Sequence, residues 1–169
     1  MFHNKKHYPQ LAVLEDNFEV IRKEYEQIKK LRMYKWPEKE KYKGSWSTFG
    51  LYHNGRKLKT SSKQCPKTVE LIESMGKVAM AGFSIMAPGT QIHAHVDKVP
   101  TFVYRVHLGI DIPKGECSFW VNGACKKWGD GEAFLFDPLL VHSAWNRTTE
   151  NRVILLLDFE SFNPPASRQ

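Results

Sequence analysis

The 169-residue sequence lacks any apolar run long enough to cross a membrane, so we expect no transmembrane segment. Its first residues also lack the apolar core of a secretory signal. The three cysteines, Cys65, Cys117 and Cys125, are odd in number and form no CxxC pair. These absences argue against a disulfide-linked secreted domain and favour a cytoplasmic protein with reduced thiols. The length fits a single domain with a sizeable core.

The chain has more basic than acidic residues, with 25 Lys and Arg against 18 Asp and Glu and a net charge of +7. Many of the basic residues crowd the first half of the sequence. This excess predicts either attraction to an anionic partner or an ordinary solvated surface, and both interpretations stay open. Because the chain shows no nucleic-acid-binding motif, we expect no nucleic acid partner.

Hydrophobic periodicity predicts helices before residue 77. Apolar residues at steps of three and four predict an amphipathic helix over about 11–31, capped at its start by Asp16 or Asn17. A polar connection over 34–43 and a hairpin over 45–59, turning at Asn54-Gly55, are expected next. A short helix then begins near Pro66.

The remainder predicts short strands separated by turn residues, a pattern typical of a β-sandwich or β-barrel. The expected strands are 78–86, 101–110, 117–121, 125–128, 133–136, 142–146 and 152–159. Residues 163–169, with two prolines, are expected to form a loose tail.

A candidate metal site lies in the run Gly-Thr-Gln-Ile-His-Ala-His-Val-Asp over 89–97. His95 and Asp97 are two residues apart, so in an extended segment both side chains leave the same face. His142, in Leu-Val-His-Ser-Ala-Trp, is the best candidate for a third ligand. Two imidazoles and a carboxylate with open positions suit a non-haem Fe(II) oxygenase. A His-x-Asp pair alone is a weak signal, because such pairs often arise by chance.

Arg152 strengthens that interpretation, because it begins the strand that follows His142. An iron site of this kind needs a co-substrate that supplies electrons for splitting O₂. 2-Oxoglutarate chelates the metal through its keto acid end and leaves a distal carboxylate to be neutralised. The planar fork of arginine matches a carboxylate in two hydrogen bonds, so Arg152 is the candidate partner.

Several blocks of sequence, taken together and in order, resemble the aspartyl/asparaginyl β-hydroxylase family of 2-oxoglutarate oxygenases. They are Leu-Ala-Val-Leu-Glu-Asp-Asn-Phe (11–18), Trp-Ser-Thr-Phe-Gly-Leu-Tyr (46–52), Cys-Pro-Lys-Thr (65–68), Phe-Ser-Ile-Met-Ala-Pro-Gly-Thr (83–90), Arg-Val-His-Leu-Gly-Ile (105–110), Trp-Gly-Asp-Gly-Glu-Ala-Phe-Leu-Phe-Asp (128–137) and Asn-Arg-Val-Ile-Leu-Leu-Leu-Asp (151–158). Because the blocks cover most of the chain, the resemblance is more specific than any single motif.

The resemblance implies a mainly β fold, a double-stranded β-helix or jelly-roll with N-terminal helices packed on it. It implies one oxygenase domain over 1–169, with a helical part at about 10–76, the jelly-roll at about 77–160 and a loose tail at 161–169. It carries Fe(II) ligation onto His95 and His142. It carries 2-oxoglutarate binding onto matching motif positions, namely Arg152, Arg105, His107 and Ser84.

One departure from the family pattern bears on the substrate. Members that hydroxylate Asp or Asn in proteins typically have glycine where this chain has Asp97. The carboxylate resembles the branch of lipid A acyl-chain 2-hydroxylases, although the membrane anchor of those enzymes is missing here. We therefore expect a hydroxylase of an unactivated C–H, acting on a peptide or protein Asp/Asn or on a lipid acyl chain. The basic charge would suit an anionic substrate of either kind.

Two alternatives belong to other functional classes. A non-catalytic jelly-roll binding module would keep the pocket without the redox chemistry, but it has no need of three metal ligands. A cupin-like metalloenzyme, such as an isomerase, would have no use for a carboxylate-binding arginine beside the metal. Arg152 therefore separates the oxygenase interpretation from the isomerase one.

Overall fold

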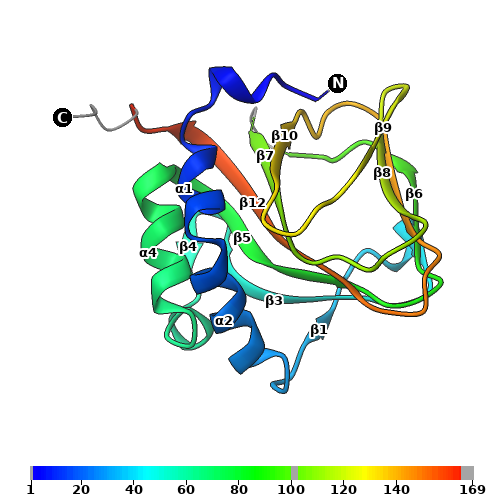
Figure 1. Cartoon of the computed structure of the whole chain (residues 1–169), viewed down its shortest axis with the longest axis horizontal. Coiled ribbons are helices and arrows are strands. Elements are labelled where there is room, and N and C mark those ends of the chain that lie inside the picture. Colours follow the sequence, from blue (N-terminus) through cyan, green and yellow to red (C-terminus); the bar gives the residue numbers. More distant parts are fainter. Residues whose placement is uncertain (1, 100–102, 165–169) are drawn as a thin grey trace.

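The computed structural model describes residues 2–99 and 103–164, and it consists of two β-sheets with helices on one side (Figure 1). The major sheet has the order β1-β3-β5-β12-β7-β10, with β4 paired to β3, and the minor sheet has the order β2-β6-β11-β8-β9. All pairs of named strands are antiparallel. The mainly β architecture predicted from the sequence is confirmed.

The bounds of the elements are as follows. The major sheet contains β1 (Tyr34–Lys35), β3 (Trp46–His53), β4 (Arg56–Lys57), β5 (Gly76–Met86), β7 (Tyr104–Asp111), β10 (Ala133–Phe136) and β12 (Arg152–Phe162). The minor sheet contains β2 (Tyr42–Lys43), β6 (Gln91–His95), β8 (Cys117–Val121), β9 (Ala124–Lys127) and β11 (His142–Asn146). The α-helices are α1 (Leu11–Asp16), α2 (Phe18–Ile28), α3 (Lys59–Ser62) and α4 (Pro66–Met75), with 3₁₀ turns η1 (Lys5–His7) and η2 (Lys39–Lys41).

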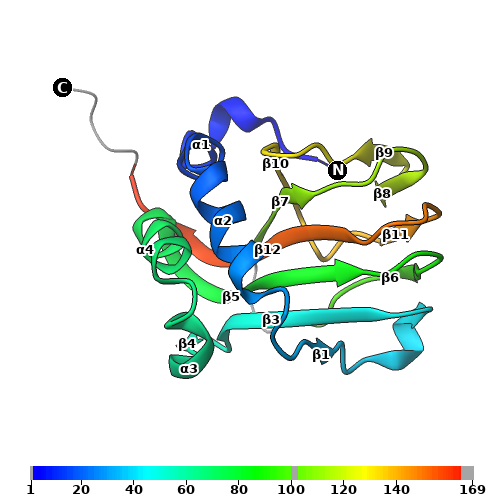
Figure 2. The same ribbon diagram turned by 60° about the horizontal axis from the view of Figure 1, so that its bottom comes forward.

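The two faces of the major sheet bury different clusters, because alternate side chains of a strand point to opposite faces. On β12, Leu155 and Leu157 pack with the helices, whereas Ile154 and Leu156 pack with side chains of the minor sheet. In Figure 2 the helices α1, α2 and α4 lie together at one side of the strands, away from β8 and β9. The cluster that contains Ile154 and Leu156 therefore fills the space between the two sheets, which is where a jelly-roll holds its site.

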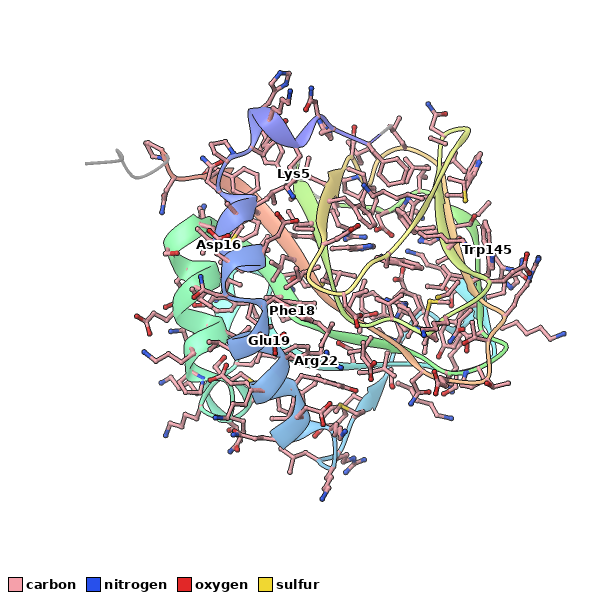
Figure 3. The ribbon with its side chains drawn as sticks, in the orientation of Figure 1. Lys5, Asp16, Phe18, Glu19, Arg22 and Trp145 are labelled. Carbon is pink, nitrogen blue, oxygen red and sulfur yellow. The ribbon has the colours of Figure 1, made fainter. Side chains whose placement is uncertain are left out.

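The predicted helix over 11–31 is two helices that meet at Asn17. Neither Asp16 nor Asn17 caps the start as predicted, since the helical chain already begins at Leu11 and the amide of Asn17 donates to the carbonyl of Val13. Most of the predicted apolar stripe is buried, but Phe18 is only partly buried and Leu31, at the end of the stripe, is exposed. Figure 3 shows Phe18 and Arg22 extending from α2 on the side of the strands, with the Arg22 guanidinium 5.8 Å from the Phe18 ring.

The predicted strands agree closely with the structure. Three of the expected ranges are reproduced without change, as β8, β10 and β11. The hairpin turns at Asn54-Gly55 as expected, and both residues have positive φ. Of the predicted strand 101–110, residues 101 and 102 lie outside the described part of the chain.

Two further expectations about secondary structure were wrong. The polar connection over 34–43 contains the short strands β1 and β2, because each pairs with a neighbouring strand over two residues. The predicted hairpin over 45–59 is present, and its first strand, β3, joins the major sheet. The predicted tail at 161–169 begins too early, since β12 continues to Phe162 and pairs there with Gly76, while 165–169 lie outside the described residues. No described helix is long and apolar enough to span a membrane.

Glu24, a buried carboxylate on α2, links this helix to the start of α4. Its oxygens accept hydrogen bonds from the backbone N–H groups of Lys67 and Thr68 at 2.9 and 2.8 Å, and from the Thr68 hydroxyl at 2.7 Å. The first N–H groups of a helix have no partner within the helix, so Glu24 satisfies donors that would otherwise be buried without one. The helical layer is thus joined by a charged side chain as well as by apolar packing.

We expect Glu24→Ala to lower the free energy of unfolding by about 2 kcal/mol, because hydrogen bonds to a charged group contribute about 1.5–3 kcal/mol. Urea denaturation followed by circular dichroism measures the change. The matched control is Glu26→Ala, an exposed position of the same helix that should change stability by less than about 0.5 kcal/mol. Equal effects at the two positions would contradict the capping role of Glu24.

The three cysteines differ in exposure, since Cys65 and Cys117 are buried and Cys125 is exposed. Burial raises the pKa of the Cys65 thiol to about 12 and also raises the pKa of Cys117. The thiolate is the reactive form, so both buried thiols should be inert in the folded protein. We expect one thiol to react rapidly with a disulfide reagent in the native state and three in guanidinium chloride. Rapid reaction of a second native thiol would show that one buried site is accessible.

Candidate metal centre and carboxylate pocket

The two histidines and Asp97 meet where β6 ends and β11 begins. His95 and His142 are paired residues on these neighbouring strands. Two residues later, the backbone N–H of Asp97 donates to the carbonyl of Pro138 at 3.1 Å, which holds the carboxylate near both rings. One ligand atom from each of the three side chains lies within 4.8 Å of the other two. The predicted His95, Asp97 and His142 group is therefore brought together by backbone pairing.

Hydrogen bonds fix the orientation of both imidazoles. Nδ1 of His95 lies 2.7 Å from the carbonyl oxygen of His93, and Nδ1 of His142 lies 2.8 Å from that of Leu140. Because a carbonyl only accepts, each Nδ1 donates its hydrogen to that carbonyl, which leaves the Nε2 atom of each ring as the one directed at Asp97. The two Nε2 atoms face the Asp97 carboxylate at 3.4 and 3.6 Å. Burial lowers the pKa of His142 to about 4, so this ring is neutral at neutral pH.

The Asp97 carboxylate is held ionised by its neighbours. Burial alone would raise its pKa, but the contact with His95 and the charge of Arg105 outweigh burial and bring the pKa well below its usual range. Lys41 donates to Oδ1 at 3.0 Å, and Arg105 donates to Oδ2. A carboxylate beside the Nε2 atoms of two imidazoles is the donor set that suits a divalent first-row metal such as Fe(II).

Arg105 is engaged on all three of its nitrogens. Nε and Nη2 donate to the two oxygens of Asp158 at 2.7 and 2.8 Å, a paired arrangement of two parallel bonds, and Nη1 donates to Asp97. Charge-assisted pairs of this kind have strong directional preferences. The structure therefore shows Arg105 as a link between Asp158 on β12 and the Asp97 carboxylate.

Arg152 is the buried cation without an acidic partner. Its side chain is 1% exposed, and neither Nε nor Nη1 has a hydrogen-bond partner among the described residues. The guanidinium carbon lies 4.8 Å from the centre of the Trp128 ring, a cation–π contact. Burial lowers the pKa of Arg152 to about 10, so it remains charged at neutral pH. Buried donors are nearly always satisfied, so these point to an anionic ligand.

Two further donors point to the same conclusion. Nδ1 of His107 accepts from the indole N–H of Trp128 at 3.3 Å, which puts the proton of this ring on Nε2, an atom with no partner. Burial and the nearby Arg152 charge lower the pKa of His107 well below its usual value, so the ring is neutral. Ser84 accepts from the indole N–H of Trp46 at 2.9 Å and keeps its hydroxyl hydrogen for donation. A carboxylate accepts only, and it fits such a set of donors.

The metal-ligand group and the donor group share one cavity. The empty space within it, open solvent included, is about 470 Å³. All seven predicted site residues line it, namely His95, Asp97, His142, Arg152, Arg105, His107 and Ser84. The walls between these polar groups are apolar and include Phe119, Phe136 and Ile154. One cavity therefore borders both Arg152 and the metal-ligand group.

Sequence reasoning missed four side chains of the site, namely Lys41, Trp46, Trp128 and Asp158. Asp158 carried a usable signal, because it is a lone acidic residue in the apolar strand Val-Ile-Leu-Leu-Leu-Asp-Phe. A buried carboxylate there needs a cationic partner, and Arg105 was already a candidate of the right charge. Lys41 carried no such signal, since it lies in a lysine-rich connection where a single contact cannot be singled out.

Several known proteins are similar to this chain in sequence. The family model described as Aspartyl/Asparaginyl beta-hydroxylase matches residues 15–161. The mouse (Mus musculus) aspartyl/asparaginyl beta-hydroxylase is 32% identical over 153 residues, which cover 86% of this chain and 20% of that protein. The ornithine lipid ester-linked acyl 2-hydroxylase of Rhizobium tropici is 31% identical over 163 residues, 90% of this chain and 57% of that protein. The chain thus spans less than two thirds of either relative.

A solved structure supports the fold independently of sequence. The prolyl-4-hydroxylase of Pseudomonas putida superposes with a TM-score of 0.59 at 11% identity, covering 88% of this chain and 97% of that one. At such low identity the similarity concerns the fold, and it agrees with the jelly-roll described above. Together with the match over 15–161, these findings show that the chain belongs to the aspartyl/asparaginyl β-hydroxylase family.

Proposed function

We propose that this chain is an Fe(II)- and 2-oxoglutarate-dependent dioxygenase in one domain that hydroxylates an unactivated C–H. The observation that carries the proposal is that a group of metal-ligand type and an unpaired buried arginine line one cavity. The names of the relatives support a hydroxylase acting on Asp/Asn or on a lipid acyl chain. A binding module would not need both halves of this site, and an isomerase would have no use for Arg152.

In this proposal His95, Asp97 and His142 hold the iron. Their three donor atoms are Nε2 of each imidazole and a charged carboxylate oxygen, which is the set found in non-haem Fe(II) oxygenases. The Nδ1 hydrogen bonds to backbone carbonyls keep the lone pairs aimed at one point. Arg105 and Lys41 keep the Asp97 carboxylate oriented. Arg105 also lines the cavity, so its positive charge would lie near the bound co-substrate as well.

Arg152, His107 and Ser84 would hold 2-oxoglutarate through its carboxylates. The buried guanidinium of Arg152 would form charge-assisted hydrogen bonds to the distal carboxylate, and the aromatic ring of Trp128 keeps the guanidinium in place. With iron and O₂ bound, 2-oxoglutarate would be converted to succinate and CO₂ while the substrate gains one hydroxyl oxygen. The apolar walls of the cavity exclude bulk water around the carboxylates, which strengthens their attraction to Arg152.

Anaerobic titration tests the proposal. Metal-free protein is mixed with Fe(II) and then with 2-oxoglutarate, and the visible spectrum is recorded. We expect one equivalent of each to bind and a weak metal-to-ligand charge-transfer band to appear only when both are present. Folded protein that binds Fe(II) but gives no band at saturating 2-oxoglutarate would contradict the proposed chemistry.

A further inference from the structure

The carboxylate ligand of the proposed metal site lies beyond the end of its strand. His95 and His142 are held in place by the pairing of β6 with β11. Asp97 comes after β6, which ends at His95, and its backbone N–H donates to the carbonyl of Pro138 at 3.1 Å. The direction of its carboxylate therefore depends on the side chains that donate to it, Lys41 and Arg105.

Of these two donors, Arg105 is the more firmly placed. It lies in β7, inside the major sheet, and its side chain is buried. Lys41 extends from the short turn η2 and divides its ammonium group between Asp97 and Glu38, at 3.0 and 2.8 Å. An ammonium group on a flexible stem acts as a point charge, whereas a planar guanidinium has fixed donor directions. Arg105 is thus the donor that can hold Oδ2 of Asp97 in one direction.

Asp158 fixes the plane of the Arg105 guanidinium. The two residues are direct partners on the antiparallel strands β12 and β7, so their side chains leave the same face of the sheet. Nε and Nη2 of Arg105 donate to the two oxygens of Asp158 at 2.7 and 2.8 Å, and both side chains are buried. Two parallel bonds to a planar group select one orientation, and in that orientation Nη1 meets Asp97.

Asp158 also balances the charges around the cavity. Apart from the histidines, the charged residues that line the cavity among those described are Glu38, Lys41, Asp97, Arg105 and Arg152. Glu38 neutralises Lys41, and Asp158 neutralises Arg105. The negative charge of Asp97 then remains for a metal ion, and the positive charge of Arg152 remains for an anion. Without Asp158, Arg105 would compete with the metal for Asp97, because opposite charges attract strongly in a buried site.

We propose that Asp158 is a positioning residue for the metal ligand Asp97. It fixes and neutralises Arg105, so that Nη1 of Arg105 holds one oxygen of Asp97 while the charge of that carboxylate stays available to the metal. Asp158 lines a groove that adjoins the cavity and is not among the residues of the cavity itself, so it acts through Arg105. The inference rests on the metal site of the proposed function and is independent of the co-substrate.

Calorimetric titration of the metal-free protein with Mn(II), in the absence of co-substrate, tests the inference. We expect Asp158→Asn to weaken Mn(II) binding by about 10-fold to 100-fold, the range typical of outer partners of metal ligands. Glu160→Gln is the matched control, because it removes the same charge from the same strand at an exposed position that pairs with Lys77. The control should change the affinity by less than about twofold, since surface ion pairs contribute little.

A double variant separates a positioning role from a structural one. Arg105→Met/Asp158→Asn leaves no buried charge of this pair without a partner, so it tests the inference even where Asp158→Asn alone fails to fold. Because Asp158 acts through Arg105, the double variant should lose about as much Mn(II) affinity as Asp158→Asn, and not the product of the losses in the two single variants. In both, the visible absorption of bound Co(II) should shift toward that of Asp97→Ala, because the carboxylate ligand is weakened or lost.

Thermal unfolding establishes that each variant compared is folded. A folded Asp158→Asn or double variant that keeps the Mn(II) affinity and Co(II) spectrum of the parent protein would overturn the inference. So would an equal loss of affinity in Glu160→Gln, which would show a general effect of charge on β12. The expected Mn(II) affinities, together with no charge-transfer band from Fe(II) and 2-oxoglutarate, would instead contradict the proposed function and leave the role of Asp158 intact.

Discussion

His142→Ala is expected to weaken Fe(II) binding by more than about 100-fold and to reduce turnover to background. Even the outer partners of metal ligands typically contribute 10–100-fold to affinity, so loss of a direct ligand should exceed that range. The His142 ring is neutral at neutral pH, and its Nε2 lies 3.6 Å from the Asp97 carboxylate. Its loss therefore removes one of the three ligand atoms that the described residues bring together. Fluorescence or calorimetric titration with Mn(II) under anaerobic conditions measures the affinity.

His93→Ala is the matched control for that experiment. His93 is exposed on the same strand as His95, and only its backbone carbonyl contacts the His95 ring. The substitution keeps that carbonyl, so metal affinity should stay within about twofold of the parent protein. Tight metal binding by folded His142→Ala, or an equal loss in His93→Ala, would mean that the metal binds elsewhere.

Arg152→Met is expected to change two properties in opposite directions. The affinity for 2-oxoglutarate should fall by about 10-fold to 100-fold, because a lost charge-assisted hydrogen bond costs about 1.5–3 kcal/mol. The metal-free protein should become more stable, because a buried cation without an acidic partner is replaced by an apolar side chain of similar length. Such a trade between stability and function is typical of residues that are kept for a ligand.

Calorimetry of 2-oxoglutarate binding and thermal unfolding of the same samples measure the two effects. Arg147→Met serves as the control, since Arg147 is exposed and pairs with Glu116 at 3.2 Å on the surface. It should alter neither property appreciably, as surface ion pairs contribute little. A less stable Arg152→Met protein with unchanged co-substrate affinity would show that Arg152 has a structural role only.

The elements that the sequence predicted well are those with strong local signals. Short runs of strand-type residues between turn residues located β8, β10 and β11, and Asn54-Gly55 located the hairpin turn, because each signal depends on neighbours in the chain. The break at Asn17 was missed because the apolar stripe continues across it with helical spacing. The strands β1 and β2 were missed because only pairing with distant strands stabilises two residues of extended chain.

The site itself was predictable in its residue types and only partly in its contacts. Spacing and resemblance pointed to His95, Asp97, His142 and Arg152, and the structure places all four around one cavity. The Arg105–Asp158 pair was not predicted, since its partners are 53 residues apart and meet only because β7 lies beside β12. That pair changes the role proposed for Arg105, which shows how a contact between strands modifies an assignment made from motif position alone.

The most direct measurement is a crystal structure of the protein grown anaerobically with Mn(II) and 2-oxoglutarate. We expect one metal ion bound by Nε2 of His95, Nε2 of His142 and a carboxylate oxygen of Asp97, with the keto acid end of 2-oxoglutarate on the metal. We also expect the distal carboxylate to be hydrogen-bonded to the guanidinium of Arg152, whose buried N–H groups lack partners among the described residues. A metal bound by other side chains, or a co-substrate whose distal carboxylate does not contact Arg152, would contradict the proposed site.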